Sequence, residues 1–176
     1  MRAMILTTSR KPSRKTRSFA KALSRFMDWR YVQRGKMSFR EFESGELWMI
    51  SELKGNPAFL SFYSNGKKLL ELSISISNIK KAEIGRGEVV YFGERYNFFG
   101  ALPANLLEKF DRKPYFPKKI VENENELTFY IAGEVIFKMR ILGIRRFDQN
   151  QQNPQEALRV QLHREPLDQR KSDREF

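Results

Sequence analysis

The chain has 176 residues, and its composition excludes several kinds of site. It carries 33 Lys and Arg against 21 Asp and Glu, a formal net charge of +12, with one histidine and no cysteine. A disulfide framework, a cysteine-based zinc or iron–sulfur site and a histidine-rich metal site are therefore impossible. The apolar runs are too short to cross a bilayer. The absence of cysteine fits a reducing interior, so we expect a cytoplasmic protein.

The positive charge is concentrated at the start of the chain. Residues 1–40 contain twelve Lys and Arg and a single acid, Asp28, which is a net charge of +11, whereas the remaining 136 residues carry a net charge of +1. A block of one sign produces a strong local field that attracts polyanions. This pattern favours a nucleic-acid partner over a membrane surface or an acidic protein.

The first predicted elements are a strand at 4–8, a basic turn and an amphipathic helix. Pro12 disfavours helical geometry at the residue before it, and Ser13 is a suitable N-cap, so a helix is expected from about Arg14 to Asp28. The spacing places one apolar stripe on this helix, formed by Phe19, Leu23, Phe26 and Met27. A basic stripe lies opposite, formed by Arg14, Arg17, Lys21 and Arg25.

Strands dominate the next part of the chain. A short helix is expected around Phe39 and Phe42, and Asn65-Gly66 is a strong signal for a hairpin turn. From Leu70 to Ser77 apolar and polar residues alternate, which is typical of a strand with one buried face. The strands predicted here are 30–34, 47–54, 58–64 and 68–77.

A connection at 78–88 leads to a second half with a similar order of elements. A helix is expected at 102–110, and residues 163–176 are charged and without apolar periodicity. The pattern predicts an α/β (α+β) fold with one domain over 1–164, divided into halves of about 1–84 and 85–164, and a disordered tail at 165–176. The strands predicted in the second half are 89–92, 118–122, 126–132, 135–144 and 157–162.

The basic turn and helix resemble the N-terminal signature of the Brix-domain family. The resemblance rests on Thr-Ser-Arg-Lys-Pro-Ser at 8–13 and Thr-Arg-Ser-Phe-Ala-Lys at 16–21, and the chain length fits the short, single-domain archaeal members. It implies two pseudo-symmetric halves, each a small mixed sheet with helices, similar to the anticodon-binding domain of class II aminoacyl-tRNA synthetases. The Gly-Pro-Thr motif that opens the second half of eukaryotic members is missing from Tyr91–Gly100, so protein contacts of that half are not transferred.

The resemblance also implies a role and partners. The chain is expected to be a ribosome-biogenesis factor that binds ribosomal RNA or its precursor during rRNA processing and subunit assembly. Ribosome-assembly proteins are expected as further partners, and no cofactor, membrane or small-molecule substrate is expected.

The basic turn and helix are the predicted RNA-binding site on physical grounds as well. Arg14, Lys15 and Arg17 lie in the first helical turn, where the helix dipole disfavours cations unless an anion such as phosphate is bound. Hydroxyl groups can add hydrogen bonds to phosphate, and arginine suits bidentate contacts. The candidate RNA-binding residues are Ser9, Arg10, Lys11, Ser13, Arg14, Lys15, Arg17, Lys21, Arg25, Arg34 and Lys36.

Other candidate residues are ambiguous. Aromatic side chains could stack on bases, but core packing is the favoured interpretation for each of them: Trp29, Tyr31, Phe39 and Trp48. Lys80, Lys81 and Arg86 form a smaller basic cluster. The pairs Lys118-Lys119 and Arg145-Arg146 are interpreted as charges at strand ends.

No catalytic set or metal site is identified in the sequence. His163 lacks a Ser/Asp arrangement and is interpreted as a surface histidine. Glu122, Glu124 and Glu126 would share one face of a strand and could hold magnesium in a nuclease, but a polar turn is the favoured interpretation. A non-catalytic rRNA-binding factor is therefore preferred, with another RNA-binding module, such as a tRNA-binding domain, or a metal-dependent ribonuclease as alternatives.

Overall fold

The computed structural model describes residues 4–42, 45–81, 83, 85–109 and 115–147. The described residues up to Arg146 belong to one compact unit. The strand predicted at 157–162, His163, the domain end at 164 and the tail at 165–176 lie outside the described residues.

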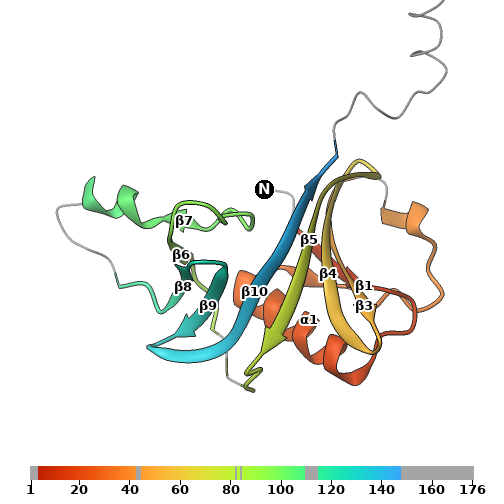
Figure 1. Ribbon diagram of the computed structural model, residues 1–176, viewed down its shortest axis with the longest axis horizontal. Coiled ribbons are helices and arrows are strands. Elements are labelled where there is room, and N and C mark those ends of the chain that lie inside the picture. The colour runs from red at the N-terminus through yellow and green to blue at the C-terminus, as the bar shows by residue number, and fades with distance from the viewer. Residues whose placement is uncertain (1–3, 43–44, 82, 84, 110–114, 148–176) are drawn as a thin grey trace, which may run out of the picture. The chain divides into compact units, whose positions relative to one another are not determined.

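A single ten-stranded mixed sheet forms the framework, in the order β2-β1-β3-β4-β5-β10-β9-β8-β6-β7 (Figure 1). The first half supplies β1 (Ile5–Thr8), β2 (Arg30–Tyr31), β3 (Glu46–Leu53), β4 (Asn56–Ser64) and β5 (Lys67–Ser77). The second half supplies β6 (Val89–Phe92), β7 (Leu102–Pro103), β8 (Lys118–Asn123), β9 (Glu126–Ile131) and β10 (Glu134–Arg146). The described helices are α1 (Arg14–Met27) and the 3-10 helices η1 (Phe39–Phe42) and η2 (Ala104–Lys109).

The strand order and directions of the first half repeat in the second. The first strand of each half runs parallel to the second and third, and the third, fourth and fifth strands are antiparallel. In the parallel pairs, Leu6 of β1 lies opposite Trp48 of β3, and Val89 of β6 lies opposite Lys118 of β8. Positions in one half can therefore be compared with positions in the other.

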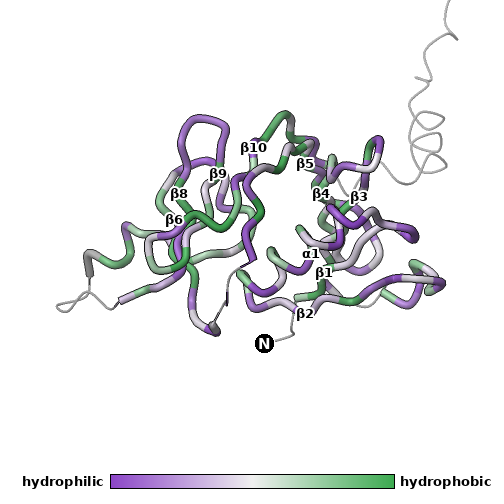
Figure 2. Tube along the Cα trace, turned by 90° about the horizontal axis from the view of Figure 1, so that it is seen from below, coloured by the Kyte–Doolittle hydropathy of each residue, from purple (hydrophilic) through white to green (hydrophobic). Residues whose placement is uncertain are grey.

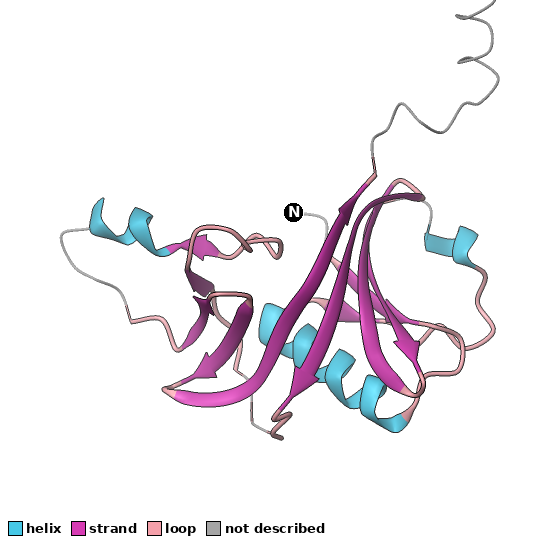
Figure 3. Ribbon diagram, viewed as in Figure 1, coloured by secondary structure: helices cyan, strands magenta, loops and turns pink. Residues whose placement is uncertain are grey.

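Two expectations about the halves are wrong. The halves do not form separate sheets, because β5 and β10 pair antiparallel and join them, as Figure 3 shows for the long central strands. The helix expected at 102–110 also does not begin at Leu102. Pairing with β6 holds Leu102 and Pro103 as a short strand, and only Ala104–Lys109 form a 3-10 helix.

The helix α1 forms where its sequence predicts it. Ser13 is the N-cap and accepts a hydrogen bond from the Thr16 N–H at 3.1 Å, and Asp28 ends the helix in the left-handed region with φ of 56°. The apolar stripe packs into the core, because Phe19, Leu23 and Phe26 are fully buried. Burial of each large apolar side chain stabilises the folded state by about 1.5–3 kcal/mol, which is why this stripe lies in the core.

The helix α1 contacts both halves of the sheet, because it packs on β1, β2 and β4 of the first half and its apolar stripe reaches the second half. Phe19 meets Phe137 of β10 edge to face, with ring centroids 5.6 Å apart. Phe26 meets Phe129 of β9 in the same manner at 5.2 Å. Figure 2 shows hydrophobic residues along the strands and hydrophilic residues in several turns. One helix thus closes a core that the two halves share.

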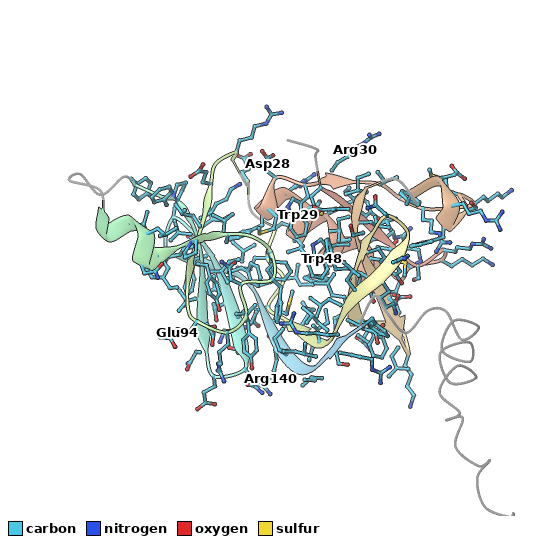
Figure 4. The ribbon with its side chains drawn as sticks, turned by 90° about the horizontal axis from the view of Figure 1, so that it is seen from above. Asp28, Trp29, Arg30, Trp48, Glu94 and Arg140 are labelled. Carbon is cyan, nitrogen blue, oxygen red and sulfur yellow. The ribbon has the colours of Figure 1, made fainter. Side chains whose placement is uncertain are left out.

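A cluster of aromatic rings extends this core beyond the end of α1. Trp48 is 2% exposed, and its indole is stacked on that of Trp29 with an interplanar angle of 7°. Phe99, from the β6–β7 connection, contacts both indoles, and Figure 4 shows the two tryptophans close together. Phe39 of η1 packs on Tyr63 of β4. The packing interpretation is therefore confirmed for Trp48 and Phe39.

Candidate functional site

The outer face of α1 carries an uncompensated row of cations, which we call the basic ridge: Arg14, Arg17, Lys21 and Arg25. All four side chains are exposed, as the stripe pattern predicts. None of them forms an ion pair with any residue that the structure describes. Since the opposite face of the helix is held in the core, the ridge is presented on a rigid support.

The N-terminus of α1 is occupied by a carboxylate from a distant strand. The Oε1 atom of Glu52, in β3, accepts the N–H of Ser13 at 2.8 Å and the hydroxyl of Thr16. Burial raises the pKa of Glu52, but the hydrogen bonds from Ser13 and Thr16 outweigh it, so this pKa lies below its usual value. A phosphate at the helix start would meet this negative charge. Within the protein, Glu52 therefore already satisfies the start of the helix, and the contact of Ser13 with phosphate stays a prediction.

The other predicted RNA-binding residues differ in their exposure and in the hydrogen bonds that they form within the protein. Arg10 and Lys11, in the turn before the helix, are exposed, and so is Lys36. The Lys15 ammonium donates to the Asn56 side chain at 2.8 Å, and the Ser9 N–H donates to the Ile50 carbonyl at 2.9 Å.

Arg34 is held within its own loop. Its Nε donates to the Met37 carbonyl at 3.2 Å, and its guanidinium lies 5.7 Å from the centroid of the Phe39 ring. Arg34 therefore stabilises the connection between β2 and η1, and its contact with RNA stays a prediction.

Lys118 lies at the start of β8, as its interpretation as a strand-end charge predicts, but it is not a surface charge. Its side chain is 1% exposed, and its Nζ has no hydrogen-bond partner in the described part of the chain. Burial lowers the pKa of Lys118, and the negative charge of Asp28 opposes that shift in part. Lys118 precedes Glu122 by four residues in β8, as Trp48 precedes Glu52 by four residues in β3. Its two-residue spacing from Ile120 was the available signal for an inward-facing position.

The magnesium cluster that is the less favoured interpretation of Glu122, Glu124 and Glu126 is not formed among the described residues. Glu122 accepts the Tyr91 hydroxyl, the Arg95 Nε at 2.8 Å and three successive backbone N–H groups, those of Glu94, Arg95 and Tyr96. Burial raises the pKa of Glu122, but the hydrogen bonds from Tyr91 and Arg95 bring it down to about 2.

Glu126 is engaged elsewhere, with Lys138 at 2.8 Å and Arg140 at 3.6 Å. Glu124 lies in the turn between β8 and β9, so the three acids do not share a strand face. No group of metal-ligating side chains occurs among the described residues.

Glu52 and Glu122 have corresponding roles in the two halves. Each lies near the end of the third strand of its half and accepts backbone N–H groups from the segment that follows the first strand. In the first half that segment starts α1, and in the second half it is the short connection to β7. Gly93 lies in this connection, where an added Cβ would come within 2.5 Å of the Glu122 side chain.

Comparisons with known proteins identify relatives over most of the chain. No family model matches it. A probable Brix domain-containing ribosomal biogenesis protein of Archaeoglobus fulgidus is 45% identical over 148 residues, which cover 81% of this chain and 97% of that protein. A protein of the same description from Methanosarcina barkeri is 35% identical and matches 82% of this chain and all of its own length.

Solved structures agree with these relatives. The crystal structure of Mil, an archaeal Imp4-like protein, is similar with a TM-score of 0.65 and 32% identity, over 82% of this chain and 99% of that one. A probable ribosomal biogenesis protein from Aeropyrum pernix has the same fold, with a TM-score of 0.57 and 20% identity. No helix in the described ranges is long and apolar enough to span a membrane. With extensive identity to such relatives, the chain belongs to the Brix-domain family of ribosomal biogenesis proteins.

Proposed function

We propose that this protein is a non-catalytic, cytoplasmic RNA-binding factor that acts in rRNA processing and ribosomal subunit assembly. It holds the phosphates of rRNA or its precursor on the basic ridge, with Arg10 and Lys11 extending the surface. The observation that carries the proposal is the exposure of four cations in a row, without ion pairs among the described residues. The names of the relatives support the biological setting.

The geometry of α1 suits a phosphate backbone. From Arg14 to Arg25 the helix rises about 16 Å, at 1.5 Å per residue, so several phosphates can be contacted together. Arginine binds phosphate in a bidentate manner, and each contact releases counterions from the RNA. Affinity is therefore expected to come from the backbone and to depend strongly on salt.

Neutralising the ridge tests this proposal. We expect the quadruple variant Arg14→Gln, Arg17→Gln, Lys21→Gln and Arg25→Gln to reduce the slope of log affinity against log salt by roughly 3, at about 0.7–0.9 for each phosphate contact. Filter binding to an rRNA fragment over a salt series measures the slope, and circular dichroism verifies the fold. The matched control removes four exposed cations elsewhere, at Lys67, Arg86, Arg145 and Arg146.

The outcomes separate the alternatives. Equal losses in the two quadruple variants would show that RNA responds only to overall charge, and the assignment to α1 would be abandoned. Stronger competition by tRNA than by rRNA fragments would favour a tRNA-binding module, for which the likeness to the synthetase anticodon-binding domain remains a prediction. Magnesium-dependent cleavage of the bound RNA would contradict the non-catalytic role.

A further inference from the structure

The strands β4 and β5 separate before β5 ends, and this leaves a notch in the sheet. They are paired as far as Phe59 and Ser73, whereas β5 continues to Ser77. From Ile74 to Ser77, the only strand that pairs with β5 in the described part of the chain is β10. A cavity of about 470 Å³ lies between the diverging strands, whose separation is visible in Figure 1.

The edge of β5 that faces the notch is a free strand edge. In an antiparallel sheet, alternate residues direct their N–H and C=O groups to one neighbour and the residues between direct theirs to the other. The groups of Ile74–Ser77 that do not face β10 therefore face the notch. Pro57 of β4 lines the opposite side of the notch, and as a proline it has no backbone N–H that could pair with β5. Such an edge is a template for pairing with an extended chain.

Two large apolar side chains that line the notch are exposed. Leu53 is 59% exposed and Leu142 is 62% exposed, although both are large aliphatic residues that line the cavity. Leu142 lies where the β5–β10 register shifts between Ile141 and Gly143, and this bulge places the leucine outside the regular alternation. Exposed apolar groups beside a free edge would be covered by apolar side chains of an added strand.

The charges at the notch are positive. Lys15 lines the cavity, and Lys54 is exposed in the turn that enters β4. Glu52 on the neighbouring strand is already satisfied by the start of α1. An occupant that carries an acidic residue near Lys15 would therefore be complementary in charge.

We propose that the notch binds an extended segment of a partner protein, with alternating apolar residues and an acidic residue at one end, which adds a strand to β5. Apart from Phe59, the large apolar side chains that line the notch are aliphatic. Such walls suit a peptide better than RNA, whose unpaired bases are recognised by aromatic stacking. This interaction is separate from the proposed binding of RNA by the basic ridge. The protein could then hold an assembly partner and RNA at the same time.

A peptide-display selection tests the proposal and does not require the partner to be identified. Random peptides of twelve residues are selected against the full chain, and those that also bind the Leu142→Asp variant are removed. We expect the remaining peptides to show alternating apolar residues with Asp or Glu near one end. Their affinity should fall about tenfold or more in Leu142→Asp or Leu53→Asp, the scale for loss of one buried leucine contact. Leu106→Asp, at an exposed leucine of η2, is the matched control and should have no effect.

Two further measurements identify the mode of binding. Each selected peptide is made in two N-methylated forms, one with the odd and one with the even backbone nitrogens methylated. One of the two forms should lose binding, because strand addition requires main-chain hydrogen bonds from one of these sets. Peptide should also shift the backbone amide resonances of Ile74–Ser77, in the wild-type protein and in the ridge variant alike. Failure to obtain peptides that depend on Leu142, or binding that survives in both methylated forms, would overturn the proposal. A twelve-nucleotide single-stranded RNA that shifts these amides and is weakened by Leu142→Asp would reassign the notch to nucleic acid.

Discussion

Replacing Lys118 by methionine should stabilise the protein, which is unusual for a change at a buried position. The Lys118 side chain is 1% exposed, and its ammonium has no hydrogen-bond partner among the described residues. An unsatisfied buried polar group costs about 1–3 kcal/mol, and methionine has a similar length without this cost. For a domain of this size the gain corresponds to a rise in Tm of roughly 2–10 °C near neutral pH.

The pH dependence of this gain follows from the direction of the pKa shift. Burial lowers the pKa of Lys118 below 10.5, its ordinary value. Between the folded and unfolded pKa values the unfolded chain binds more protons, so the stability of the wild-type protein rises with pH in that window. The advantage of Lys118→Met should therefore be largest below the folded pKa and should shrink as the pH approaches 10.5.

Thermal unfolding followed by circular dichroism at several pH values between 6 and about 10 measures the difference between variant and wild type. Lys119→Met is the control, since that ammonium lies 5.3 Å from the centroid of the Tyr130 ring and is not fully buried. It should show no comparable gain. A Lys118→Met protein that is less stable at every pH would refute the reasoning, because the attraction between the ammonium and Asp28 must then outweigh the cost of burial.

Three further changes test the core and the Glu122 network. Leu23→Ala should lower the free energy of unfolding by about 2–5 kcal/mol in urea titrations, because it empties a fully buried position, and an unchanged midpoint would show that the apolar stripe faces outward. Glu122→Gln should destabilise the protein at pH 7 by about 1–3 kcal/mol. Because the pKa of Glu122 is lowered to about 2 from 4.5, this difference should be lost as the pH falls from about 4.5 toward 2, and a pH-independent difference would contradict the ionic role. Gly93→Ala should lower Tm, since its Cβ would clash with Glu122, and a wild-type melting curve would show that this connection can shift.

Local patterns in the sequence were sufficient for α1, for β5 and for the exposed part of the candidate site. The spacing of Phe19, Leu23 and Phe26 predicts the buried face of α1, and the same period places the four cations of the basic ridge opposite it. Alternation predicts β5, and Asn65-Gly66 predicts the turn before it. These features depend on residues within one or two turns of one another, which is the range over which periodicity and turn preferences act.

Only the tertiary structure decided which charged groups are free to bind. Glu52 reaches Ser13 across 39 positions of the chain, and Glu122 reaches Tyr91 across 31, so no local pattern relates these partners. The pairing of β5 with β10 merges the halves into one sheet, which no local pattern predicts. The two-residue spacing from Ile120 is compatible with an inward-facing Lys118, but its burial depends on which strands and rings pack around it after the chain has folded.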